Sequence, residues 1–85
     1  MNLYLLRKEN NNNYGTYWGA VVAAPTEEIA KDIHPDDRKE LIDWDNENVV
    51  TDDWVKDRED VIIKFIGVAK KGTKRGVIFS SFFDG

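Results

Sequence analysis

The cationic side chains near the C-terminal end have the type and spacing of an anion-binding site. Lys70, Lys71, Lys74 and Arg75 lie within six residues, on a turn whose sequence is KKGTKRG. Side chains of this kind bind phosphate or carboxylate groups. The segment from Gly67 onward has the glycine spacing of a phosphate-binding loop, but threonine precedes lysine, and a strand is expected where such loops lead into a helix. The alternative is a solvated turn that protects the strands from edge pairing.

Aromatic side chains near the first predicted turn can complete such a site. Tyr14 and Tyr17 can stack on a nucleotide base. Trp18 begins an apolar strand, so we expect it in the core. One hypothesis is therefore a sponge for a small phosphate-containing signalling nucleotide. Its ligand-binding residues would be Tyr14, Tyr17, Lys70, Lys71, Lys74 and Arg75.

Side chains suited to catalysis are few. The chain has no cysteine, and its sole histidine, His34, precedes Pro35. Ser80 and Ser81 lie in a predicted strand, and nothing resembles a nucleophile elbow. We expect His34 to be an ordinary surface or helix-end residue. The sequence predicts a protein that is not an enzyme, with no catalytic residue and no cofactor.

The acidic stretch from Asp43 to Asn48 (DWDNEN) offers oxygen ligands at alternate positions, as a calcium loop does. Counted from Asp43, the sixth position is Asn48, where glycine is required for the turn. The twelfth is Trp54, where a bidentate glutamate is required. We therefore predict no dedicated metal site.

The formal charge of -4 is distributed unevenly along the chain. Residues 1–25 carry +1, residues 26–60 carry fourteen acids against five bases, or -9, and residues 61–85 carry +4. Carboxylates on a rigid surface can imitate a phosphate backbone and dock in the cationic groove of a nucleic-acid-binding protein. The alternative is charge that only keeps the protein soluble. The expected protein-binding residues are Asp43, Asp45, Glu47, Asp52, Asp53 and Asp57.

Hydropathy and turn residues predict four strands, over residues 3–6, 17–24, 61–69 and 77–83, with a hairpin loop from Asn10 to Gly15. Thr26 can cap a helix that ends near His34, and Asp37 with Glu40 resembles the capping box of a second helix. The fold class is α+β, in the order strand, strand, helix, optional second helix, strand, strand. It has a small antiparallel sheet with one or two short helices packed on one face and a hairpin joining the last two strands.

Side chains alternate in the third strand, and the last strand is rich in aromatics. Phe79, Phe82 and Phe83 exceed what one sheet face needs. We therefore expect the helix to cover one side of the last strand and a second copy of the chain to cover the other, through the Phe82 and Phe83 side. Trp44 and Trp54 should both be at least half buried. Alternation places Val61, Ile63 and Phe65 on one face and Ile62, Ile66 and Val68 on the other.

The 85 residues, 41% apolar, predict one folded domain, residues 1–85. No apolar run approaches the ~20 residues of a membrane span, and the N-terminus lacks the order of a signal peptide. Without cysteine the chain suits a reducing compartment, so we expect a cytoplasmic protein. Its negative charge argues against direct binding to nucleic acid or to membranes.

Both ends of the chain resemble a recurring type. Leu3 to Arg7 (LYLLR) and Ser81 to Gly85 (SFFDG), with shorter pieces such as Gly19 to Ala24, are similar to the corresponding parts of short bacterial and phage proteins. The resemblance implies no activity, cofactor or catalytic residue.

Size, charge segregation and the lack of a catalytic constellation favour a non-enzymatic binding protein encoded by a phage or mobile element. It would inhibit a host defence factor, as anti-CRISPR proteins do, by docking its acidic surface on a protein partner that binds nucleic acid. The nucleotide sponge is one alternative. An accessory subunit of a larger bacterial assembly is another.

Overall fold

The computed structural model describes residues 1–8, 16–46 and 53–83, and only the backbone of Thr16, Phe82 and Phe83. The expected hairpin loop at residues 10–15 therefore lies outside the described residues. The elements are β1 (Asn2–Arg7), β2 (Thr16–Ala24), α1 (Glu27–Lys31), the short 3-10 helix η1 (Arg58–Asp60), β3 (Ile62–Val68) and β4 (Gly76–Phe83).

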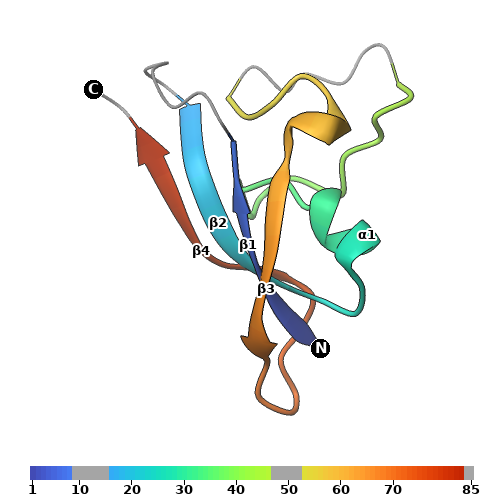
Figure 1. Cartoon of the computed structure of the whole chain (residues 1–85), viewed down its shortest axis with the longest axis vertical. Coiled ribbons are helices and arrows are strands. Elements are labelled where there is room, and N and C mark those ends of the chain that lie inside the picture. Colours follow the sequence, from blue (N-terminus) through green and yellow to red (C-terminus); the bar gives the residue numbers. More distant parts are fainter. Residues whose placement is uncertain (9–15, 47–52, 84–85) are drawn as a thin grey trace.

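The four strands form one antiparallel sheet in the order β3-β1-β2-β4. The predicted α+β class and antiparallel sheet are confirmed. The predicted hairpin between the last two strands is wrong, because β3 and β4 lie at opposite edges of the sheet. Residues 69–75 join them past the ends of β1 and β2 (Figure 1), and the Ala69 N–H donates to the Met1 carbonyl at 2.9 Å. Three inter-strand gaps span about 14 Å, which seven residues reach with ease.

One face of the sheet is buried. Tyr4 and Leu6 of β1 pair with Val22 and Ala20 of β2, and all four side chains are buried. This core face is covered by α1, seen at the right of the sheet in Figure 1, whose Ala30 is fully buried. The helix begins as predicted at Thr26, whose hydroxyl accepts the Ile29 N–H.

The helix is too short to cover the core face, so irregular chain completes the layer. Ile33 and Ile42 after α1, and Trp54 and Val55 before η1, are buried in the same apolar cluster. Trp54, 4% exposed, and the partly buried Trp44 lie as expected. The second layer is thus mostly coil.

The second predicted helix, from Asp37, does not form, and α1 ends at Lys31 and not near His34. The carboxylate of Asp36 accepts the Arg38 N–H, which closes a turn in place of a helix start. The Ile42 N–H then donates to the Asp32 carbonyl at 2.7 Å and draws the chain back to the helix end.

The register shifts at three places in the sheet, and two of these shifts change a predicted side-chain position. Between Tyr17 and Gly19 the register with β4 shifts, and Trp18 is 48% exposed, so its predicted core position is wrong. In β3 the register shifts after Phe65, so Val68 lies on the same face as Phe65 and not on the opposite one.

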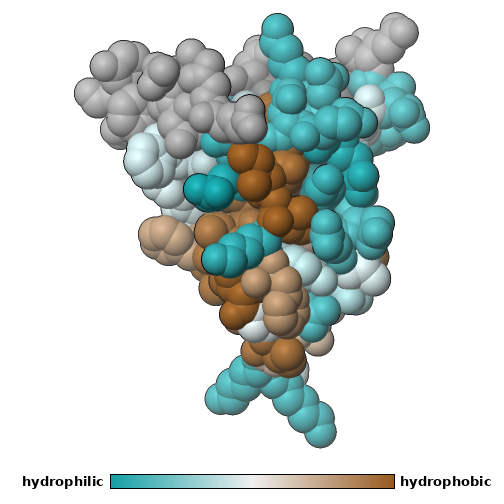
Figure 2. Space-filling view, viewed as in Figure 1, coloured by the Kyte–Doolittle hydropathy of each residue, from teal (hydrophilic) through white to brown (hydrophobic). Residues whose placement is uncertain are grey.

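Among the described residues, no helix has the length and hydropathy needed to cross a membrane. Figure 2 shows apolar residues gathered along the middle of the molecule, between hydrophilic residues at the upper right and the hydrophilic tip of the lower loop.

Gly19 is required where β1 and β2 meet, because a Cβ at this position would overlap the backbone carbonyl oxygen of Leu6. We expect Gly19→Ala to lower the free energy of unfolding by about 1 to 3 kcal/mol, since the paired backbones must move apart. Gly67→Ala is the matched control, because its Cβ would meet nothing within 4 Å. It should change stability by less than about 0.5 kcal/mol. Urea unfolding measures both, and equal effects would contradict this role of Gly19.

Candidate functional site

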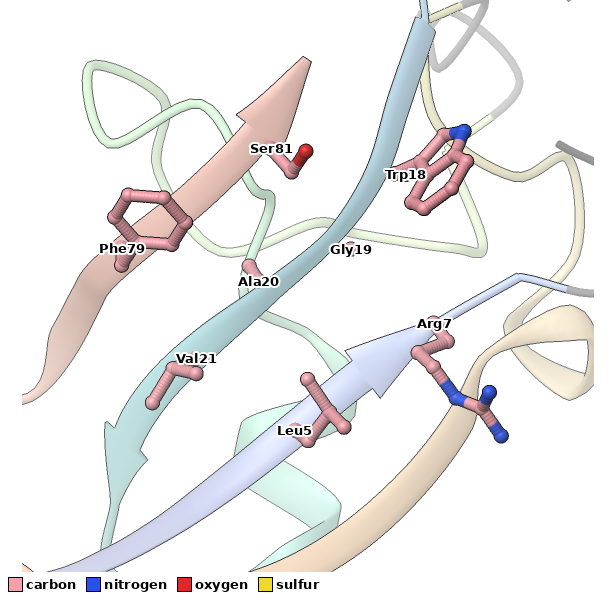
Figure 3. Close-up of a pocket in the computed structure, with 8 residues that line it drawn as sticks. All are labelled: Leu5, Arg7, Trp18, Gly19, Ala20, Val21, Phe79 and Ser81. Atoms are coloured by element: carbon pink, nitrogen blue, oxygen red, sulfur yellow. The ribbon is translucent and has the colours of Figure 1, made fainter. Parts of the chain in front are cut away.

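The outer face of the sheet is not covered by helix or coil in the described chain and carries a hollow. The hollow has a volume of about 220 Å³ and is lined by Leu5, Arg7, Trp18, Gly19, Ala20, Val21, Phe79 and Ser81. In Figure 3 the side chains of Leu5, Arg7, Trp18, Val21, Phe79 and Ser81 stand on the near side of β1, β2 and β4, while α1 lies behind the sheet. Gly19 and Ala20 line the hollow from the strand itself, since glycine has no side chain and the Ala20 methyl lies in the core. Trp18 and Phe79 are 48% and 66% exposed, so their rings are available to a ligand. We call this surface the open face.

The four strands contain two charged side chains, and both are cationic. Arg7 in β1 and Lys64 in β3 are exposed. Because Arg7 pairs with Gly19 and Lys64 with Leu5, both side chains lie on the open face. Within the described chain, neither has a carboxylate within 4 Å. The described acids between β2 and β3 lie in residues 26–46 and 53–60, the two stretches whose apolar residues cover the core face.

His34 joins this covering segment to the sheet. Its side chain is 2% exposed, its Nδ1 accepts the Asp36 N–H at 2.9 Å and its Nε2 lies 3.0 Å from Asp53 Oδ1. Since Nδ1 accepts, the proton of the neutral ring is on Nε2 and is donated to Asp53. The Asp53 carbonyl accepts the Tyr17 N–H at 2.8 Å, and the Tyr17 ring meets His34 edge-on. The expectation of an ordinary surface or helix-end His34 is wrong.

This arrangement makes the imidazole structural. Both ring nitrogens are bonded, so neither is free to take a proton from a substrate. Burial lowers the pKa of His34, the attraction of Asp53 opposes that shift, and Lys39, whose Nζ lies 3.5 Å from Asp53, reinforces it. Burial likewise lowers the pKa of Lys8 and raises that of Tyr17.

Two more carboxylates hold the covering segment. Asp32 Oδ1 accepts from Trp44 Nε1 at 2.9 Å and from Arg58 Nε at 3.0 Å. Arg58 also donates to the Glu28 carbonyl. The bidentate bond from Arg38 holds the pKa of Asp36 at about 2. The acidic segment thus contributes to folding as well as to surface charge.

The predicted protein-binding acids occupy different environments. Asp43, Asp45 and Asp57 are exposed, and Asp43 accepts the Asp45 N–H in a local turn. Asp53 is held by His34 and Lys39, so it is not a free surface charge. Glu47 and Asp52 lie outside the described residues.

The predicted nucleotide site is not assembled in one place. The loop with Lys70, Lys71, Lys74 and Arg75 lies next to the end of β2 at Ala23, whereas Tyr17 is at the opposite end of this strand. The six residue steps from Tyr17 to Ala23 span about 20 Å in an extended strand. Tyr17 is also partly buried against His34. Tyr14 lies outside the described residues.

A smaller hollow, of about 140 Å³, lies beside the basic loop. Arg75 shares its lining with Asp37, Lys39 and Glu40. Acids therefore face at least one cation of this loop, which makes the hollow a poor anion site.

Among the described residues no group of three or more histidines or carboxylates could hold a metal ion. Compared with protein-family models, curated proteins and solved structures, the chain shows no significant match in any of the three.

Sequence reasoning missed the open face. Its residues come from four different strands. Whether their side chains share one face of the sheet depends on the strand order and on the bulges. The signal that could have found it is the position of two charged residues: Lys64 is the charged residue inside a predicted strand, and Arg7 directly follows another. By alternation Lys64 shares its face with Ile62, and Arg7 shares its face with Leu5.

The protonation of His34 should destabilise the fold. Its pKa is below the ordinary 6.5, so the unfolded chain binds the proton first as the pH falls. The stability that the neutral ring provides is complete above pH 6.5 and is lost progressively below it, down to the pKa of the folded state. Because the chain has one histidine, NMR titration of its ring reads this pKa directly. Lys39→Met should raise it, and a wild-type value above 6.5 would contradict the buried neutral ring.

Asp53 and Asp43 form a matched pair of aspartates. Asp53→Ala leaves the buried Nε2–H of His34 without its acceptor, so we expect a loss of about 1 to 3 kcal/mol. The exposed Asp43→Ala should cost less than about 0.5 kcal/mol. Urea unfolding at pH 7.5 compares them, and a neutral Asp53→Ala would remove the structural role assigned to this carboxylate.

Proposed function

We propose that this protein is a non-enzymatic binding protein that docks on a protein partner through the acidic side formed by α1 and the coil. The observation that carries the proposal is the division of charge by the sheet. Cationic Arg7 and Lys64 lie on the open face, and the acid-rich segment covers the other face.

The exposed carboxylates on this side are the docking groups. Asp43, Asp45 and Asp57 are exposed, whereas the carboxylates of Asp32, Asp36 and Asp53 are paired within the chain. Exposed charges of one sign steer a partner of the opposite sign and add to the association rate. The complementary partner is a protein with a cationic groove for nucleic acid.

The bonds that hold the described parts of the segment support this function. Asp32 bonds Trp44, which lies between Asp43 and Asp45, and Arg58, which follows Asp57, so the backbone next to these carboxylates is already held before binding. The biological form that we propose is an inhibitor of a host defence factor, encoded by a phage or mobile element.

The test is the triple reversal Asp43→Lys, Asp45→Lys, Asp57→Lys, which leaves the structural carboxylates in place. Wild type and variant are used in parallel affinity purifications from the source cell, followed by competition of each captured protein with duplex DNA. We expect a captured nucleic-acid-binding protein that DNA displaces and that the triple variant binds at least about tenfold more weakly, with an effect that shrinks at high salt.

The matched control is the neutral set Asp43→Asn, Asp45→Asn, Asp57→Asn, which keeps side-chain size and should give an intermediate loss. Circular dichroism and urea unfolding confirm the fold of each variant. Capture that the triple reversal leaves unchanged would rule out the acidic side as the docking surface.

A further inference from the structure

The open face has the side chains that bind unstacked bases and phosphates. Trp18 on β2 and Phe79 on β4 present exposed rings at the hollow. Arg7 lies on the next strand, β1, and Lys64 lies beyond it on the edge strand β3. Aromatic rings stack on bases of any sequence, and arginine binds phosphate through paired donors. Each of the four strands supplies one of these groups, so they extend across the face over about 14 Å.

The charge of this face differs from that of the whole chain. The total of -4 predicts no direct contact with nucleic acid, but a phosphate group responds to the charges within about one Debye length, 8 to 10 Å. The strands carry no acid, and Arg7 and Lys64 are their two charged side chains. The described acids that come nearest in the chain are Glu59 and Asp60 of η1, which precede the β3 end that pairs with Arg7. The side chains that the strands themselves place on the open face therefore carry a positive charge.

The hollow favours one part of a long ligand over a whole small one. Its volume of about 220 Å³ is less than the roughly 300 Å³ at which pockets for small molecules begin. Its walls, Trp18 and Phe79, are about half exposed or more. Such a site holds one planar group while the remainder of the ligand runs over the surface.

A second copy of the chain fits this face less well. In a two-fold dimer the same patch meets itself, so Arg7 and Lys64 of one copy would approach those of the other. No acid of the strands is available to compensate them, and like charges at an interface are unfavourable.

We propose that the open face binds single-stranded nucleic acid, with bases on Trp18 and Phe79 and phosphates on Arg7 and Lys64. This site is separate from the acidic docking side and does not depend on it.

The test is fluorescence anisotropy of a labelled eight-nucleotide oligo-dT with the full chain, at salt concentrations from 50 to 200 mM. We expect saturable binding at low salt. Trp18→Ala and Phe79→Ala should each weaken it at least about tenfold, as the loss of a stacked base predicts. Arg7→Gln should reduce the slope of log K against log salt by about 0.7, the value for one phosphate contact with a single strand.

The matched controls lie on the core face and its covering layer. Phe65→Ala removes a ring that is 55% exposed on that face, and Lys31→Gln removes a cation of α1. Both should bind as wild type does, and urea unfolding verifies each fold.

Several outcomes would overturn the proposal. One is the absence of binding at 50 mM salt, and another is wild-type affinity in both Trp18→Ala and Phe79→Ala. If dTMP competed as effectively as the unlabelled oligonucleotide, the face would be assigned to a free nucleotide. If poly-glutamate did so, the face would be assigned to an acidic peptide. A wild-type dimer in sedimentation that Trp18→Ala converts to a monomer would assign it to a second copy.

Discussion

The fold depends on covering one sheet face with a chain that has little regular structure. A helix of five residues cannot cover four strands, so Ile33, Ile42, Trp54 and Val55 of the coil complete the core. Irregular backbone has N–H and carbonyl groups that no ladder satisfies, and these must find other partners. His34 and Asp53 supply two of these partners, because His34 Nδ1 accepts the Asp36 N–H and the Asp53 carbonyl accepts the Tyr17 N–H. The bond between their side chains joins both parts of the coil.

The same constraint gives some of the acids between β2 and β3 a structural role. Among the described ones, Asp32, Asp36 and Asp53 accept bonds from tryptophan, arginine, histidine and lysine. Short carboxylate side chains suit this purpose because they bond nearby backbone groups in turns. Other described acids, such as Asp43 and Asp57, are exposed and add negative charge to the surface of the covering layer.

With the second layer confined to one side, the other side of the sheet stays uncovered. Its strands are largely apolar on both faces, as strands buried on both sides are, yet Trp18 and Phe79 are exposed on the same face as Arg7 and Lys64. The protein therefore presents two surfaces of opposite character on opposite sides of a thin sheet. In the two functions proposed above, one side would engage a cationic partner and the other an anionic one.

The sequence by itself determined the four strands, the α+β class and the helix start at Thr26, because these follow from local hydropathy, β-branched residues and capping. Tertiary structure decided the rest. Strand order could not be read locally, since a seven-residue loop can close a hairpin or cross the sheet equally well. The helix expected at Asp37 was lost to the Asp36 side chain, which bonds Arg38. Trp18 lies outside the core because the pairing of β2 with β4 shifts register between Tyr17 and Gly19. The role of His34 was decided by Asp53, nineteen residues further along the chain, whose approach only the folded core brings about.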